Sequence, residues 1–146
     1  MKEYINTTTL YIWTDGSCLR NPGPGGWAAI LRYKDVEKAI SGGNPDTTNN
    51  QMELTAVIKA LQLLKKTSNI DITTDSQYVI NGITKWIYGW KKKNWKNVKN
   101  IELWKELDTE VAKHTIKWNW IKGHTGHAEN EKCDDLARSE AQKFNN

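Results

Sequence analysis

Two acidic residues follow segments that the sequence predicts to be strands. Apolar and polar residues alternate over Leu10–Thr14, a pattern typical of a half-buried strand, and Asp15 comes next. Asp75 directly follows a second predicted strand, Ile70–Thr74. If the two strand ends are neighbours in one sheet, both carboxylates meet at the same edge.

Two further acids are predicted to lie on helices and to face inward. Glu53 falls on the apolar stripe of a helix predicted over Gln51–Lys66. Asp134 lies about one turn before Ala137, at the edge of the apolar face of a last helix predicted over Ala128–Phe144. These positions allow all four acids to converge.

Carboxylates that converge repel one another and raise one another's pKa unless a cation neutralises them. An all-oxygen ligand set, without cysteine or paired histidine, favours Mg²⁺ or Mn²⁺ over zinc. Two divalent cations held by shared carboxylates are the arrangement used for in-line displacement at phosphate. The four acids therefore predict a metal-dependent centre for phosphate chemistry.

Each acid also has a purely structural explanation. Asp15 could close a turn, and Asp75 could cap the helix that follows it. Glu53 could complete a capping box with Asn50, and Asp134 could be an exposed helix charge. Each explanation is reasonable for one residue alone, but the four acids together favour a shared site.

His124 lies between Gly123 and Gly126 and is the histidine best placed to carry protons. The alternative is an ordinary histidine in a surface loop. The nearby acids favour the functional interpretation.

The positive charge of the chain is concentrated in one segment. The net charge is +4, yet no acidic residue occurs over Ser76–Ile101, and this segment holds six of the 21 basic residues. Aromatic residues alternate with its lysines, as expected of a surface that neutralises a polyphosphate backbone and packs rings on sugars or bases. The alternative is a solvated helix face whose tryptophans point into the core. The residues concerned are Lys85, Trp86, Tyr88, Trp90, Lys91, Lys92, Lys93, Trp95, Lys96 and Lys99.

Length and composition exclude several classes of protein. A chain of 146 residues fits one domain of common size. The longest apolar run, Trp27–Leu31, is far too short to span a bilayer, and Met1–Thr9 does not resemble a signal peptide. Two cysteines, Cys18 and Cys133, form neither a disulfide framework nor a four-cysteine zinc site. We expect a cytoplasmic protein with reduced thiols and no membrane partner.

The predicted elements describe an α/β (α+β) fold with three leading strands in an antiparallel meander. Later strands alternate with helices, which predicts a mixed sheet covered by helices on both faces. Glycine and proline predict loops over Gly16–Gly26 and Gly42–Thr48. The remaining predicted elements are the strands Trp27–Tyr33, Val36–Ser41 and Thr115–Ile121, a helix over Ser76–Thr84 and a helix containing Ile101 and Val111.

Five sequence blocks occur in a fixed order along residues 8–143. They are Trp13–Cys18 with Asn21–Gly26, Thr47–Leu54, Thr74–Tyr78, Gly123–His127, and Asn130 to Asp134. In this order and with these acids, the blocks resemble bacterial ribonuclease H of type 1. The resemblance implies the ribonuclease H fold, a five-stranded mixed sheet whose first three strands are antiparallel, as a single catalytic domain over residues 1–146.

The resemblance also implies an activity, which is endonucleolytic hydrolysis of the RNA strand of an RNA–DNA hybrid, leaving 5′-phosphate and 3′-hydroxyl ends. By motif matching, Asp15, Glu53, Asp75 and Asp134 would ligate two Mg²⁺ ions, with Mn²⁺ able to substitute. His124 matches the histidine proposed to assist proton transfer or product departure.

Three groups of substrate contacts follow from the same resemblance. Those matching the residues that read the RNA 2′-hydroxyl are Gly16, Ser17, Cys18, Asn21, Asn49, Asn50 and Gln77. Those matching a phosphate pocket for the DNA strand are Arg32, Thr48 and Asn100. The basic residues and tryptophans of residues 85–99 match the family's basic handle, which grips the DNA strand; this handle is short between Trp95 and Val98.

Three other functions remain open at the level of sequence. One is a non-catalytic module that binds RNA–DNA hybrids, another is a different nuclease of the same fold superfamily, and the third is the ribonuclease H domain of a reverse transcriptase. Four intact acids disfavour a pure binding module, because clustered anions facing phosphate would weaken binding. We expect an RNA–DNA hybrid as the partner, no obligate protein partner, and a monomer.

Overall fold

The computed structural model describes residues 9–123 and 127–144. Its strands are β1 (Thr9–Cys18), β2 (Gly23–Tyr33), β3 (Val36–Thr47), β4 (Asn69–Thr74) and β5 (Thr115–Trp120). Its helices are α1 (Asn49–Gln62), α2 (Gln77–Asn81), α3 (Ile87–Lys92), α4 (Ile101–Val111) and α5 (Ala128–Gln142), with a π-helical segment, Gly82–Trp86, between α2 and α3.

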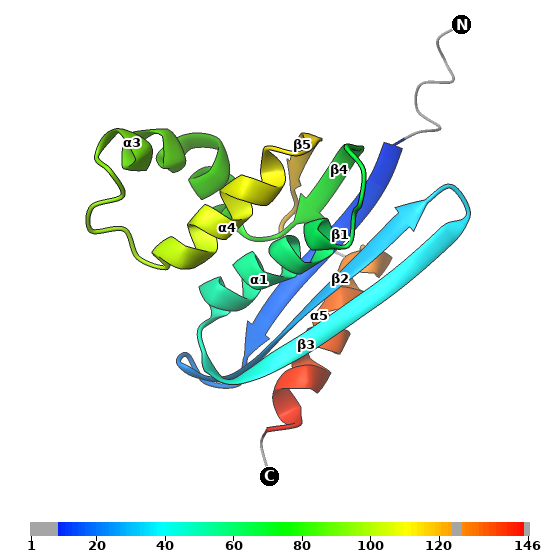
Figure 1. Cartoon of the computed structure of the whole chain (residues 1–146). Coiled ribbons are helices and arrows are strands. Elements are labelled where there is room, and N and C mark those ends of the chain that lie inside the picture. The colour runs from blue at the N-terminus through cyan, green and yellow to red at the C-terminus, as the bar shows by residue number, and fades with distance from the viewer. Residues whose placement is uncertain (1–8, 124–126, 145–146) are drawn as a thin grey trace, which may run out of the picture.

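The strands form one mixed sheet in the order β3-β2-β1-β4-β5 (Figure 1). The pairs β1–β2 and β2–β3 are antiparallel, whereas β1–β4 and β4–β5 are parallel. This topology confirms the predicted fold class, including the antiparallel meander of the first three strands.

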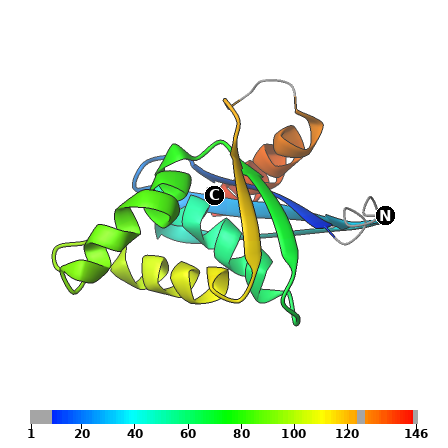
Figure 2. The same ribbon diagram turned by 90° about the horizontal axis from the view of Figure 1, so that it is seen from above.

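Helices cover both faces of the sheet, as the sequence predicts (Figure 2). Helix α1 packs on β1 and β2 from one side and carries α4 on its outer surface, while α5 packs on β1, β2 and β3 from the other side. The larger core lies under α1 and α4. Its fully buried side chains include Ile12, Leu54, Val57, Leu61, Ile72, Trp104 and Leu107.

The leading strands are longer than the glycines and prolines predict. Most of the expected loop Gly16–Gly26 is strand, since β1 runs to Cys18 and β2 begins at Gly23. The expected loop Gly42–Thr48 belongs to β3 up to Thr47.

The physical reason is that these glycines serve close packing rather than turning. A Cβ atom on Gly26 would lie 2.0 Å from the carbonyl oxygen of Ala137, so α5 can approach β2 only because the side chain is absent. The predicted loops over Gly16–Gly26 and Gly42–Thr48 are therefore wrong over most of their length.

Helix boundaries also differ from the predicted ones. Helix α1 ends at Gln62 instead of Lys66, and α5 ends at Gln142 instead of Phe144. The helix expected over Ser76–Thr84 is α2 followed by the π-helical segment. Among the residues that the structure describes, no helix has the length and apolar character needed to cross a membrane.

The π-helical segment packs against the core through Gly82. A Cβ atom there would lie 2.0 Å from Cη2 of the buried Trp104 ring. Gly89, in α3, has no atom within 4 Å of the corresponding position.

We therefore predict opposite effects for two glycine-to-alanine variants. Gly82→Ala overpacks the site against Trp104 and lowers the free energy of unfolding by about 1–3 kcal/mol. In Gly89→Ala the added methyl group enters open space on a helix, so the free energy of unfolding rises by up to about 1 kcal/mol. Urea denaturation of both variants is the test, and equal destabilisation would contradict this account.

Candidate active site

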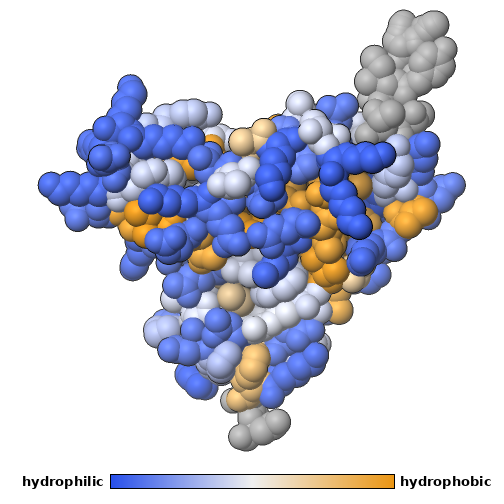
Figure 3. Space-filling view, in the orientation of Figure 1, coloured by the Kyte–Doolittle hydropathy of each residue, from blue (hydrophilic) through white to orange (hydrophobic). Residues whose placement is uncertain are grey.

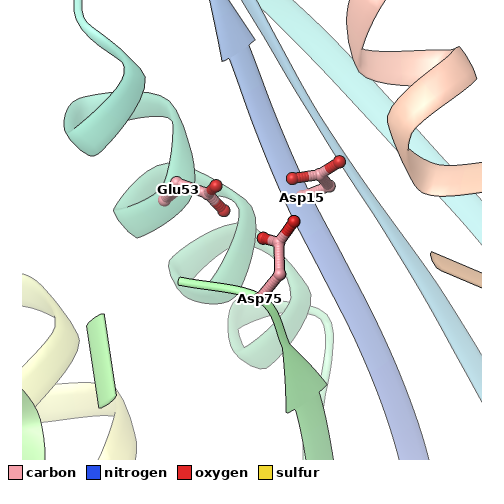
Figure 4. A group of neighbouring side chains, drawn as sticks. All are labelled: Asp15, Glu53 and Asp75. Carbon is pink, nitrogen blue, oxygen red and sulfur yellow. The ribbon is translucent and has the colours of Figure 1, made fainter. Parts of the chain in front are cut away.

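Three acidic side chains from three different elements point toward one another (Figure 4). Asp15 lies on β1, Glu53 on α1, and Asp75 just after the end of β4. Each offers a carboxylate oxygen, and these oxygens all lie within 4.8 Å of one another. The structure thus brings together three of the four acids that the sequence singles out.

The sheet topology accounts for two of these positions. Because β1 and β4 run parallel, with Trp13 in register with Thr73, Asp15 and Asp75 follow at the same end of the sheet. Asp15 is not at the end of its strand as predicted, since β1 continues to Cys18.

Close approach between α1 and β1 accounts for the third acid. Gly16 makes this possible, because a Cβ atom there would lie 2.5 Å from the backbone nitrogen of Glu53. Helix α1 begins at this level because the Thr48 hydroxyl accepts a hydrogen bond from the backbone N–H of Gln51, 3.2 Å away.

The capping explanations for two of the acids do not hold in the structure. Ser76, not Asp75, caps α2, since its hydroxyl accepts from the Val79 N–H at 3.1 Å. Thr48 caps α1, so Glu53 completes no capping box with Asn50. Neither Asp75 nor Glu53 therefore serves as a helix cap.

Burial and mutual repulsion favour protonated forms in the isolated cluster. The pKa of Asp15 is raised to about 8, chiefly because burial penalises the charged form and further because Asp75 lies nearby. The pKa of Glu53 is raised well above its usual value, first by burial and then by the charge of Asp15. A cation bound between these carboxylates would lower the pKa values of both Asp15 and Glu53.

The residues present fit a hard divalent cation. One carboxylate oxygen of Glu53, Oε1, is buried and has no hydrogen-bond partner among the described residues. A buried acceptor of this kind is costly unless something neutralises it. The donors are all carboxylate oxygens, which suit Mg²⁺ or Mn²⁺.

Asp134 lies beside this group rather than inside it. It projects from α5 near Asp15, and its charge contributes to the raised pKa of Asp15. Its Oδ2 also forms an ion pair with Nη2 of Arg138 at 3.1 Å. Asp134 is half-buried, so the alternative that it is simply an exposed helix charge is wrong.

Asp75 has two further neighbours, Trp120 and Gly123, of which Gly123 belongs to the Gly123–His127 block and Trp120 belongs to none of the quoted blocks. The indole N–H of Trp120 donates to the backbone oxygen of Asp75 at 3.1 Å, and a Cβ atom on Gly123 would lie 3.0 Å from Asp75 Oδ2. Trp120 ends β5, next to β4 in the sheet, and only knowledge of that pairing would have identified it.

A polar pocket of about 410 Å³ adjoins the start of α1. It gathers six of the predicted substrate contacts, and Asn21 Oδ1 braces it by accepting from the Asn49 N–H at 3.1 Å. Arg32 does not line this pocket; it pairs with Glu37 at 2.6 Å and with Glu129 at 3.0 Å. The lining residues are Asn21, Pro22, Thr48, Asn49, Asn50, Gln51, Lys99 and Asn100.

The other predicted contacts surround the acids or fall outside the described residues. Gly16 and Ser17 continue β1 beyond Asp15, and Cys18 ends that strand, half-buried. Gln77 opens α2 and is exposed. The predicted role of His124 lies outside the described residues.

The basic segment projects beside α4, where Figure 3 shows hydrophilic side chains gathered at the left of the view. Its tryptophans divide into two kinds. Trp90 and Trp95 pack partly against the core, as the alternative interpretation holds, whereas Trp86 is 43% exposed. Lys91 forms an ion pair with Asp108 at 2.9 Å. The exposed lysines of the segment are Lys85, Lys91, Lys92, Lys93, Lys96 and Lys99.

Comparison with known proteins gives one consistent result. The RNase H family model matches residues 7–142. Ribonuclease H of Vibrio vulnificus (strain YJ016) is 57% identical over 141 residues, covering 93% of this chain and 91% of that protein. Ribonuclease H of Pectobacterium atrosepticum is 58% identical over 135 residues, covering 89% and 88%. The crystal structure of LC9-RNase H1, a type 1 RNase H with the type 2 active-site motif, is similar with a TM-score of 0.88 and 32% identity over 94% of this chain and 74% of that one.

The raised pKa of Asp15 predicts a pH-dependent stability of the metal-free protein. Between the ordinary value of 3.8 and about 8, the unfolded chain has lost this proton while the folded chain keeps it. Stability is therefore lost as pH rises through this window. Asp15→Asn removes this pH-dependent loss of stability. Its free energy of unfolding, relative to that of the unsubstituted protein, therefore increases by at least about 1 kcal/mol from pH 5 to pH 8.

Urea denaturation in EDTA at the two pH values measures this difference. Asp35→Asn, at an exposed position between β2 and β3, is the matched control and leaves the pH dependence unchanged. An Asp15→Asn variant with the same pH dependence as the unsubstituted protein would refute the electrostatic account.

Proposed function

The chain belongs to the ribonuclease H family, and we propose that its four acids hydrolyse the RNA strand of RNA–DNA hybrids with Mg²⁺. The observation that carries this proposal is the convergence of Asp15, Glu53 and Asp75 within 4.8 Å, with Asp134 beside Asp15. The reaction leaves 5′-phosphate and 3′-hydroxyl ends.

The four acids differ in their surroundings and therefore in their proposed roles as metal ligands. Asp15 interacts electrostatically with Glu53, Asp75 and Asp134, so it is the central ligand. Glu53 contributes a carboxylate whose Oε1 is buried without a hydrogen-bond partner, and Asp134 is half-buried beside the cluster. Two Mg²⁺ ions bound by these carboxylates would supply a nucleophilic water and stabilise charge on the leaving 3′ oxygen.

Substrate recognition is assigned to two surfaces, the polar pocket and the handle. The polar pocket offers amide and hydroxyl groups such as those of Asn21, Thr48 and Asn100, which suit sugar and phosphate oxygens. The 2′-hydroxyl, which donates and accepts hydrogen bonds, distinguishes the RNA strand. The handle of residues 85–99 neutralises phosphates of the DNA strand through its exposed lysines.

The remaining assignments follow from family membership. We propose that His124 assists proton transfer or product departure, and that residues 1–146 form one catalytic domain. We further propose that the protein acts as a cytoplasmic monomer without an obligate protein partner.

Cleavage assays with one labelled RNA test the proposal directly. The RNA is presented alone, paired with RNA, and paired with DNA, each in Mg²⁺ and in EDTA. We expect cleavage of the hybrid only, abolished by EDTA, and lowered about a thousandfold or more in kcat by Asp15→Asn.

Two results would contradict the proposal. Hybrid bound but not cut in either Mg²⁺ or Mn²⁺ would favour a binding module. Equal cleavage of DNA duplexes would favour another nuclease of the fold superfamily.

The role of the handle predicts a change in salt dependence. Lys96→Ala removes a phosphate contact, so the slope of log affinity against log salt falls in magnitude by up to about 0.9. Lys117→Ala, at an exposed position on β5, is the matched control. Fluorescence anisotropy of a labelled hybrid in EDTA measures both slopes, and identical slopes for Lys96→Ala and the unsubstituted protein would exclude this contact.

A further inference from the structure

Asn100 has an unusual conformation at the start of α4. Its backbone lies in the left-handed region, with φ 60° and ψ 34°, which asparagine tolerates better than most residues. Asparagine at a helix N-cap usually caps the helix with its side chain, but the Asn100 side chain makes no capping bond. The amide is used for something else.

Instead, the Asn100 amide bridges two other elements. Its Oδ1 accepts a hydrogen bond from Nε2 of Gln51 on α1 at 3.1 Å, and its Nδ2 donates to the hydroxyl of Tyr78 on α2 at 2.9 Å. Both ends of the amide therefore have a partner, which defines its orientation. One N–H of Nδ2 remains for another acceptor.

Both partners are themselves held in place. The Gln51 Oε1 accepts from the Thr47 hydroxyl at 2.8 Å, and the Tyr78 hydroxyl accepts a second bond from Trp104 Nε1 at 3.1 Å. The Tyr78 ring also lies against the buried Trp104 ring, with centroids 5.2 Å apart. The bonds form one continuous chain from the end of β3 to α4.

We propose that Gln51 and Tyr78 are positioning residues that hold Asn100 for the DNA strand of the hybrid. This inference rests on the proposed function. Asn100, Lys99 and Thr48 line the same polar pocket, so the fixed amide lies at a pocket that also offers a cation and a hydroxyl. Gln51 precedes the acid Glu53 by two residues on α1, so the network fixes the pocket relative to the cleavage site.

Preorganisation explains why the network matters. A side chain that is already oriented loses less conformational entropy when the substrate binds. Gln51 and Tyr78 therefore act on hybrid affinity through Asn100 and leave the chemical step alone. The competing explanation is that Gln51 merely ties α1 to α4.

The chain offers a matched control for that competing explanation. Gln62, also on α1, donates from Nε2 to Glu106 on α4 at 2.9 Å, but it is exposed and outside the pocket. Both glutamines thus donate a side-chain hydrogen bond from α1, Gln51 to the residue that precedes α4 and Gln62 to a residue within α4.

The test compares Gln51→Met with Gln62→Met, because methionine keeps the length of the side chain and removes its hydrogen bonds. KM and kcat are measured on the hybrid, and the dissociation constant of the hybrid is measured separately in EDTA. We expect Gln51→Met to raise KM and the dissociation constant about three- to tenfold, the value of one hydrogen bond, with kcat unchanged. Gln62→Met leaves all three unchanged.

A double-mutant cycle shows whether Gln51 acts through Asn100. Asn100→Gly keeps the left-handed backbone without strain and removes the amide. If the proposal is right, Gln51→Met adds no further loss of affinity in this background, and Tyr78→Phe weakens affinity in the otherwise native chain.

Three outcomes would overturn the inference: unchanged affinity in both Gln51→Met and Tyr78→Phe, equal losses in Gln51→Met and Gln62→Met, or full additivity with Asn100→Gly. Failure of the unsubstituted protein to cleave hybrid would refute the proposed function. The affinity measurements in EDTA would still decide the positioning role.

Discussion

Repulsion among buried carboxylates is the constraint on which the rest of the structure depends. Asp15, Glu53 and Asp75 place their oxygens within 4.8 Å of one another, and the pKa values of the first two are raised, chiefly by burial and further by the neighbouring carboxylates. Such an arrangement is unfavourable without a neutralising cation, so it must be enforced by the surrounding fold. Parallel pairing of β1 with β4 and the close approach of α1 to Gly16 supply that enforcement.

The packing features that position the acid cluster also position the surfaces around it. Missing side chains let helices approach the sheet at Gly16 and at Gly26, and at Gly82 the π-helical segment packs against the core. The cap of α1 at Thr48 lies in the polar pocket, while Glu53 lies in the same helix. The proposed substrate contacts and the proposed catalytic acids are thus placed by shared elements, so a nucleic-acid strand bound in the polar pocket would be aligned with the acid cluster.

Much of this could be predicted from sequence, for identifiable reasons. Strand alternation and helical periodicity predict the elements, and acids at predicted strand ends or on apolar stripes are unusual enough to indicate a site. The length of β1 through Gly16 could not be predicted, because a glycine that permits packing looks like one that permits a turn. The bonds from Gln51 to Asn100 and from Trp120 to Asp75 join residues far apart in the chain, and no local pattern reveals them.

Calorimetric titration of Mg²⁺ into the metal-free protein tests the central claim most directly. In two buffers of different ionisation enthalpy, the apparent binding enthalpies report how many protons are released. The account predicts saturable binding with proton release at pH 7, because the pKa of Asp15 is about 8 before a cation binds, and loss of that binding in Asp75→Asn. Binding without proton release, or equal binding in Asp75→Asn, would contradict it.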